Sequence, residues 1–246
     1  MNRDDIWRAM DAQRLRLAAL LDELTDDEWL QASLCDGWTV RDVAAHLTLQ
    51  QLRIGDVLAG LIRYPGSLGG MNRMIRLSAR HKAEQPVEQL IGELRATVGS
   101  RRSNVGVTNL ETLIDILVHG QDIAIPLERD LEMATSASAT AASRVRSQLG
   151  TRTGRVFTDV GVQRFRLIAT DTTWSEGDGP EVRGPIGAIL LLLTGRLGGL
   201  HRLTGAGADE LRAQFQTGVM VSYPKGERQA VSYTRRLSSC VSQAVG

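Results

Sequence analysis

Two histidines and a group of carboxylates lie in two stretches of the sequence whose spacing suits the binding of a divalent metal ion. His46 lies in CDGWTVRDVAAHL (35–47), a stretch typical of an amphipathic helix. Asp115 and His119 lie in ETLIDILVHGQDI (111–123), four residues apart, so on a helix they project from the same face. Glu111 and Asp122 extend this polar stripe in both directions.

His46, Asp115 and His119 together have the composition of a catalytic metal site. Two imidazoles and one carboxylate with an open position are typical of catalytic zinc, and they also suit iron or nickel. The residue types admit plainer interpretations as well. His46 could be an ordinary buried imidazole, the acidic stripe a solvated face, and the Asp115–His119 pair a helix-stabilising contact. Spacing alone leaves these alternatives open.

The composition indicates a globular protein with a sizeable core. The chain has 246 residues, of which 42% are hydrophobic, and a net charge of +1, so nothing predicts a nucleic-acid partner. Cys35 and Cys240 form no metal-binding spacing, and two distant cysteines favour a reducing compartment. The N-terminus lacks the apolar core of a signal peptide, and GAILLLLTG (187–195) is too short to span a bilayer. We therefore expect a cytoplasmic protein without a membrane partner.

The first half of the chain predicts an antiparallel helical bundle. A 3.6-residue period predicts a helix over 4–25. Thr39 and Asp42 form a capping box that opens a second helix, expected to continue until Pro65, with a glycine loop at 66–70. The segments 71–85 and 86–100 predict a helix pair or one helix kinked at Pro86. A further strong helix is expected over 108–125.

The second half predicts a small α+β domain. A helix with a Thr or Ser cap is expected over 135–150, and the alternation in 155–174 predicts a hairpin. The segment 175–185 reads as a loop with a possible short strand. Pro185 opens an apolar helix over 186–203, and 207–215 forms a short helical turn. The fold class is thus α+β, with a four-helix bundle (1–132), a small α+β domain (133–215) and a segment 216–246 that is a tail or an additional strand.

The motifs DGWTVRDVAAHL (36–47) and DILVHGQDIAIPL (115–127) resemble the mycothiol-dependent maleylpyruvate isomerase family, part of the DinB-like group of metal-binding four-helix bundles. The stretches 184–205 and 207–213 resemble the C-terminal domain of the family, so the resemblance extends from about residue 5 to 215. It implies a divalent ion, usually zinc, on His46, Asp115 and His119, although the characterised isomerase has glutamate where this chain has Asp115. Asp122 could orient His119.

The resemblance implies a metal-dependent enzyme that uses mycothiol for isomerase or S-transferase chemistry on a small electrophile. The metal would lower the pKa of the thiol, which attacks the electrophile as thiolate. Neither Cys35 nor Cys240 is an evident nucleophile. Arg41, Arg53 or Arg196 could hold the cofactor or a carboxylate substrate, but no catalytic or cofactor-binding residue is assigned. A binding protein for apolar ligands, a bundle with a structural metal, and a monomer or homodimer all remain open.

Overall fold

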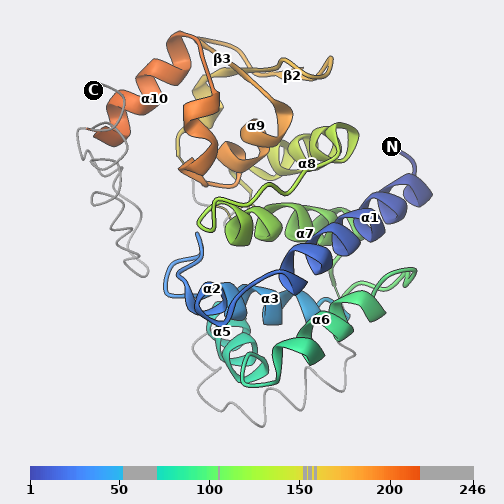
Figure 1. Cartoon of the computed structure of the whole chain (residues 1–246). Helices are drawn as coiled ribbons and strands as arrows, with labels where there is room; N and C mark the ends of the chain where they lie inside the picture. The colour runs from blue at the N-terminus through green and yellow to red at the C-terminus, as the bar shows by residue number, and fades with distance from the viewer. Residues whose placement is uncertain (52–70, 105, 152–153, 155–156, 158–159, 217–246) are drawn as a thin grey trace.

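The computed structural model describes residues 1–51, 71–104, 106–151, 154, 157 and 160–216. Helix α7 (Asn109–Ala124) lies in the middle of the molecule. Helices α1 (Arg3–Asp22) and α3 (Val40–Thr48) pack on one side of it, and α8 (Thr135–Gln148) packs on the other (Figure 1). The bundle also contains α2 (Asp26–Leu30), α5 (Met71–Lys82) and α6 (Val87–Ala96). This architecture confirms the predicted fold class.

Capping boxes define where the helices of the bundle begin. The Thr39 side chain accepts a hydrogen bond from the backbone N–H of Asp42, whose carboxylate accepts one from the Thr39 backbone, as the sequence predicted. Thr108 and Glu111 form the same box at the start of α7. Each box satisfies two otherwise unpaired N–H groups, and both helices that carry candidate ligands therefore start at a defined residue.

The helix expected to run from Thr39 to Pro65 is shorter than predicted. Helix α3 ends at Thr48, and the N–H of Leu49 bonds to the His46 carbonyl. The remainder of that prediction, including the glycine loop, lies outside the described residues. The segments 71–85 and 86–100 form a pair of helices, because Pro86 is the N-cap of α6.

The second half contains a three-stranded sheet with the order β2-β1-β3. Strand β1 (Arg166–Ala169) pairs antiparallel with β2 (Ser175–Glu176) and parallel with β3 (Glu181–Gly184). The hairpin expected over 155–174 is thus displaced toward the C-terminus, and the possible strand in 175–185 is two strands. The cap predicted for α8 is also wrong, because Ala134 is the N-cap and provides no side-chain hydrogen bond.

The apolar helix expected over 186–203 divides at Gly195. Helix α9 (Ile186–Leu193) is almost wholly buried, and it is followed by the 3₁₀-helix η4 (Leu197–Arg202). Gly195 has a φ of 80°, a conformation that glycine adopts at little cost and that ends α9. Helix α10 (Ala206–Gln216) includes the helical turn expected at 207–215. Residues 217–246, with Cys240, lie outside the described part.

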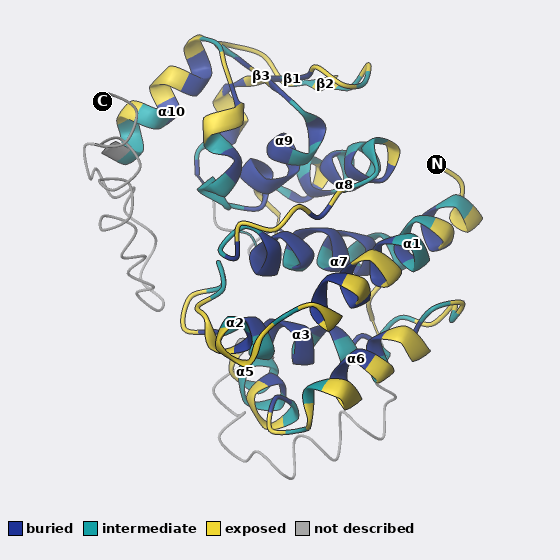
Figure 2. Cartoon of the chain, in the orientation of Figure 1, coloured by how far each residue is buried: buried dark blue, intermediate teal, exposed yellow. Residues whose placement is uncertain are grey.

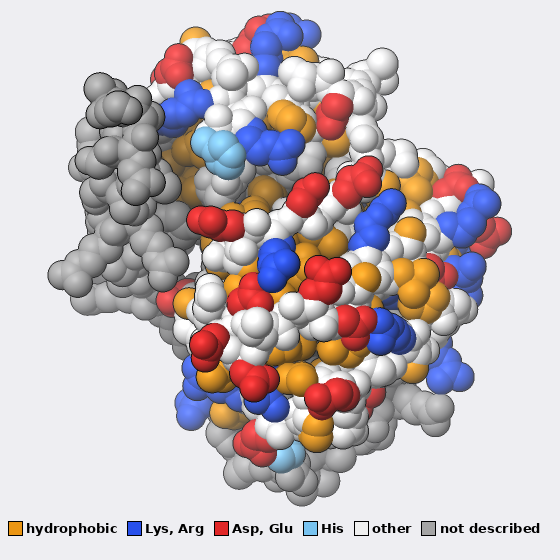
Figure 3. All heavy atoms as spheres, in the orientation of Figure 1, with side chains coloured by type: hydrophobic (Ala, Val, Ile, Leu, Met, Phe, Trp, Pro, Cys, Tyr) orange, Lys and Arg blue, Asp and Glu red, His pale blue; other side chains and the backbone are white. Residues whose placement is uncertain are grey.

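One hydrophobic core runs through both halves of the chain. Helix α8 packs against both α7 and α9, and buried residues of all three belong to the same cluster (Figure 2). The division at residue 132 therefore stays a prediction. Acidic and basic side chains are interspersed on the face drawn in Figure 3. No helix in the described segments combines the length and the apolar character that crossing a bilayer requires.

Candidate metal centre

The three residues that the sequence singled out as metal ligands lie together between α3 and α7. The His46 Nε2 atom is 3.5 Å from Asp115 Oδ2, and the His119 Nε2 atom is 3.3 Å from Asp115 Oδ1. The imidazole rings of His46 and His119 have centroids 5.0 Å apart. One ligand atom from each residue lies within 4.8 Å of the other two.

These distances fit a divalent ion. Ligand atoms of a tetrahedral zinc ion, each about 2.1 Å from the metal, lie about 3.4 Å from one another. Both measured distances are close to that spacing, although each joins one imidazole to a different oxygen of Asp115, and one ligand atom from each residue lies within 4.8 Å of the other two. The donors, two imidazole nitrogens and one carboxylate, are those that zinc, iron and nickel accept. The residues present therefore fit the ion that the sequence predicted.

Local structure explains how the three side chains meet. Helix α3 packs against α7, and His46 lies on α3 two turns after the capping box. The ring of Trp38, which precedes that box, lies edge-on to the His46 imidazole with centroids 5.4 Å apart. On α7, the four-residue spacing places Asp115 and His119 one turn apart on the same face.

The other nitrogen of His119 faces a buried acid. The His119 Nδ1 atom is 2.8 Å from Oδ2 of Asp122, the residue that the sequence analysis considered as a partner that could orient His119. The Asp122 side chain is fully buried and accepts two hydrogen bonds from the Arg196 guanidinium, at 3.1 and 2.8 Å. Arg196 also donates to the Thr194 carbonyl. Arg196 therefore neutralises Asp122, and Asp122 orients His119.

Cys35 joins this second group, which the sequence did not predict. Its Sγ atom lies 3.1 Å from Oδ2 of Asp122 and 3.5 Å from Nδ1 of His119. Cys35, His119 and Asp122 also lie close enough together to share an ion. However, the Arg196 guanidinium already pairs with Asp122, and a metal cation beside it would meet a like charge. We therefore favour His46, Asp115 and His119 as the ligand set.

The charges of the site reinforce one another. Desolvation opposes ionisation of the partly buried Asp115, but the neighbouring imidazoles of His46 and His119 lower its pKa well below the usual value. Burial likewise opposes the charge of His119, while the Asp115 carboxylate raises the pKa of His119 well above that of a free imidazole. Burial also disfavours the charge of Asp122, but Arg196 holds the pKa of Asp122 far below its ordinary value.

The sequence analysis named other candidates for the site, and most of them lie away from the metal ligands or outside the described residues. Glu111 caps α7 and forms an ion pair with Arg144 at 2.6 Å, so it serves helix packing. Arg41 donates a hydrogen bond to the carbonyl of Gln85, at the end of the loop between α5 and α6. Arg53 is outside the described residues. Of the three arginines, the structure brings Arg196 to the site.

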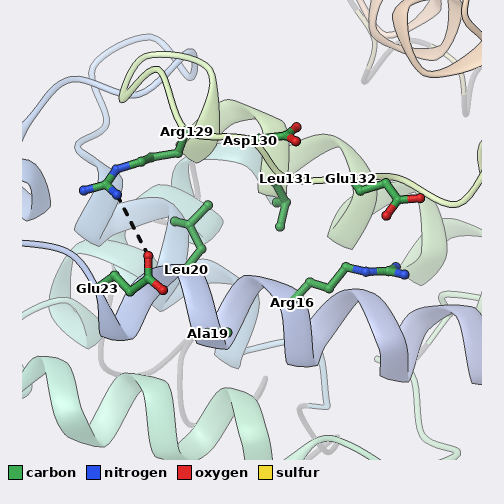
Figure 4. Close-up of a pocket in the computed structure, with 8 residues that line it drawn as sticks. All are labelled: Arg16, Ala19, Leu20, Glu23, Arg129, Asp130, Leu131 and Glu132. Carbon is green, nitrogen blue, oxygen red and sulfur yellow. Dashed lines mark ion pairs between the residues drawn. The ribbon is translucent and has the colours of Figure 1, made fainter.

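A cavity of about 190 Å³ opens beside the ligands. Its walls combine the apolar side chains of Ile114, Val118 and Phe157 with three polar ones, Asp115, His119 and Arg196. A larger hollow of about 430 Å³ lies between α1 and the segment after α7 (Figure 4). Charged side chains of both signs line that hollow, and an ion pair between Arg129 and Glu23 crosses it. The smaller cavity is the one adjacent to candidate chemistry.

Fold and site together define a helical bundle that carries a His–Asp–His group, joined to a small α+β unit. Residues 10–124 match the family model of the mycothiol maleylpyruvate isomerase N-terminal domain. This match agrees with the resemblance seen in the sequence, and it covers the part of the chain that carries His46, Asp115 and His119.

Solved structures show a similar fold over most of the chain. A crystal structure of the mycothiol-dependent maleylpyruvate isomerase is similar with a TM-score of 0.53 and 13% identity, and it covers 85% of this chain and 94% of its own. A histidine-to-alanine mutant of that isomerase gives a TM-score of 0.55 and 12% identity over the same shares. A comparison with curated proteins finds no match.

Proposed function

We propose that this protein is a metal-dependent enzyme that uses a low-molecular-weight thiol, mycothiol, to isomerise or S-conjugate a small electrophile. The observation that carries the proposal is the convergence of His46, Asp115 and His119 beside a cavity bordered by Arg196. The family of the N-terminal domain and the fold of the similar isomerase structures support the same chemistry.

The three side chains would hold a divalent ion, for which we propose zinc. When bound, the ion would lower the pKa of a coordinated thiol, so that the thiol is a thiolate near neutral pH. Asp122 keeps the His119 ring oriented through the 2.8 Å contact at Nδ1, which leaves Nε2 for the ion. The apolar side chains of Ile114, Val118 and Phe157 limit the water that can enter.

Arg196 is suited to hold an anionic group of the substrate. The Arg196 side chain is 21% exposed and borders the cavity, while three of its N–H groups bond to Asp122 and Thr194. A guanidinium has five N–H groups, so Asp122 and Thr194 do not occupy all of them, and Arg196 can still donate to a carboxylate in the cavity. A cavity of about 190 Å³ suits a small molecule. We therefore propose a small carboxylate-bearing electrophile as the substrate class.

The first test is the metal content of protein purified without added metal and without a histidine tag. We expect wild type to retain about one divalent ion per chain and His46→Ala to lose it, since two ligands hold an ion less well than three. His201→Ala, which removes an exposed histidine of η4, is the matched control and should keep the metal. Equal metal in wild type and His46→Ala would overturn the ligand set.

The second test separates a catalytic ion from a structural one. Metal-free and reloaded wild type are mixed with mycothiol and maleylpyruvate, and both the thiol and the products are quantified. Unchanged thiol with an isomerised product indicates an isomerase, and consumed thiol with a conjugate indicates a transferase. If metal removal leaves the fold and the turnover unchanged, the proposed role of the ion is wrong.

A further inference from the structure

Asp115 has a further partner that the metal ligands do not account for. The side-chain amide of Gln50 donates a hydrogen bond from Nε2 to Asp115 Oδ2 at 2.7 Å. Gln50 lies one turn after His46, just beyond the end of α3, and it is buried. A short hydrogen bond from a buried amide restricts how the carboxylate can rotate.

The opposite end of the Gln50 amide faces a buried cation. The Arg14 guanidinium on α1 lies 3.5 Å from Gln50 Oε1, a long contact, and it donates to the Thr97 carbonyl at 3.0 Å. Arg14 is fully buried, which is rare for a charged side chain unless it is paired. It is also 3.4 Å from Asp11 on its own helix.

The chemistry of the two neighbours determines which way the amide of Gln50 points. Arginine can only donate hydrogen bonds, and an ionised carboxylate can only accept them. The oxygen of the amide must therefore face Arg14, and its nitrogen must face Asp115. In the opposite orientation the amide nitrogen would face guanidinium N–H groups, and the amide oxygen would face the carboxylate.

We propose that Gln50, held in this orientation by Arg14, is a positioning residue that presents Asp115 to the metal ion. Its hydrogen bond uses one lone pair of Oδ2, and it leaves Oδ1, which lies 3.3 Å from His119 Nε2, available for coordination. The chain of contacts runs from α1 through the end of α3 to α7. This inference rests on the proposed metal site and adds to it the residues that set its affinity.

The test compares Gln50→Met with Gln51→Met. Methionine has about the same length as glutamine but cannot make either hydrogen bond. Gln51 is adjacent, half-buried, and accepts a hydrogen bond from Ser100, so it is a matched control. The readouts are the Zn²⁺ dissociation constant, measured by competition with a chromophoric chelator, and the thermal unfolding of the metal-free proteins.

We expect Gln50→Met to bind Zn²⁺ about 10- to 100-fold more weakly than wild type, the range typical for loss of a partner that orients a ligand. Gln51→Met should bind Zn²⁺ as wild type does. Without metal, Gln50→Met and Gln51→Met should unfold at similar temperatures. A purely structural role of Gln50 would lower the unfolding temperature without this difference in affinity, and that result would overturn the proposal.

Two further variants keep the proposal testable if Gln50→Met does not fold. Gln50→Asn retains the amide but is one methylene too short to contact both neighbours, so weaker Zn²⁺ binding supports the proposal and wild-type binding contradicts it. Arg14→Lys keeps the charge but has one nitrogen in place of the planar fork. It should bind Zn²⁺ with an affinity between those of wild type and Gln50→Met. An affinity equal to that of wild type would show that Arg14 does not help to orient Gln50.

The His46→Ala variant distinguishes failure of this inference from failure of the proposed site. If wild type and His46→Ala bind Zn²⁺ equally, the site is wrong and this inference falls with it. If only His46→Ala binds more weakly and Gln50→Met binds as wild type does, the site stands and the inference alone is overturned.

Discussion

The two nitrogens of the His119 ring face two groups of similar composition and different electrostatics. On the Nε2 side, Asp115 is contacted by His46, His119 and the Gln50 amide. On the Nδ1 side, Asp122 is contacted by Cys35 and by two N–H groups of Arg196. Both sides thus combine an acid with this histidine, but among the described residues a permanent cation directly contacts the acid on the second side alone.

This difference shows that residue types alone do not define a metal site. A carboxylate paired with a guanidinium is already neutralised, and it acts as a fixed support. In the contacts that the described residues make with Asp115, no lysine or arginine takes part, so its charge remains for an ion. The exposure of the two acids agrees, since the Asp115 side chain is 31% exposed and the Asp122 side chain is fully buried.

The largest effect that would test this contrast is a loss of protein stability when the Arg196–Asp122 pair on the Nδ1 side is broken. Arg196→Met leaves the buried Asp122 carboxylate without its partner, and we expect the free energy of unfolding to fall by about 3–5 kcal/mol. Chemical denaturation of the metal-free protein measures it. The double variant Arg196→Met/Asp122→Asn should recover most of the loss, because the uncompensated charge is gone. A loss below about 1 kcal/mol in Arg196→Met would mean that Asp122 does not depend on Arg196.

On the Nε2 side, the corresponding change should affect metal binding more than stability. Asp115→Asn removes an ionised ligand, so we expect Zn²⁺ affinity to fall by at least about 100-fold, beyond the effect of losing an orienting partner. Without metal, we expect a loss of stability smaller than that of Arg196→Met, because Asp115→Asn weakens the contacts with His46 and His119 but leaves no unpaired buried charge. Chelator competition and denaturation measure the two quantities. Glu111→Gln, one turn earlier on α7, is the control and should bind Zn²⁺ normally.

The sequence analysis identified the candidate ligands on the Nε2 side, but it did not identify the residues that contact and orient them. The cap at Thr39 and the four-residue spacing of Asp115 and His119 are local features, so they can be read from the chain. Packing of α3 against α7, which brings His46 to this pair, depends on contacts remote in sequence. Family resemblance supplied that step.

Neither local sequence features nor the resemblance identified three residues that contact the site, namely Gln50, Arg14 and Cys35. Gln50 is uncharged and follows a helix end that the sequence did not reveal, and Arg14 resembles the other charged residues of α1 until its burial is known. Cys35 reaches the site because its loop bonds to the end of α7, where the Leu34 N–H contacts the Asp122 carbonyl. The parallel pairing of β1 with β3 is likewise a tertiary feature that alternation does not encode.

The dependence of folding stability on pH below neutrality also tests the contrast, through Asp122. Because the pKa of Asp122 is lowered by Arg196 and His119, its ionised form stabilises the fold above about pH 4, and this contribution is lost as pH falls below the unfolded-state value of about 3.9. Asp122→Asn should therefore be about 2 kcal/mol less stable than wild type at pH 6, with a gap that narrows below pH 4. Denaturation at several pH values measures the gap, and Asp209→Asn, at an exposed ion pair, should show none. A gap that widens at low pH would have the wrong sign for a lowered pKa.

The smallest effect is expected at Cys35, and it decides which nitrogen of His119 faces the ion. Cys35→Ala removes a weak hydrogen bond to Asp122, so we expect a stability loss of about 1 kcal/mol or less and Zn²⁺ affinity within about threefold of wild type. Chelator competition on Cys35→Ala and Asp115→Asn, side by side, is the measurement. If Cys35→Ala lost the metal while Asp115→Asn retained it, the ion would lie on the Nδ1 side with Asp122, and Arg196 would have to release that carboxylate for the metal to bind.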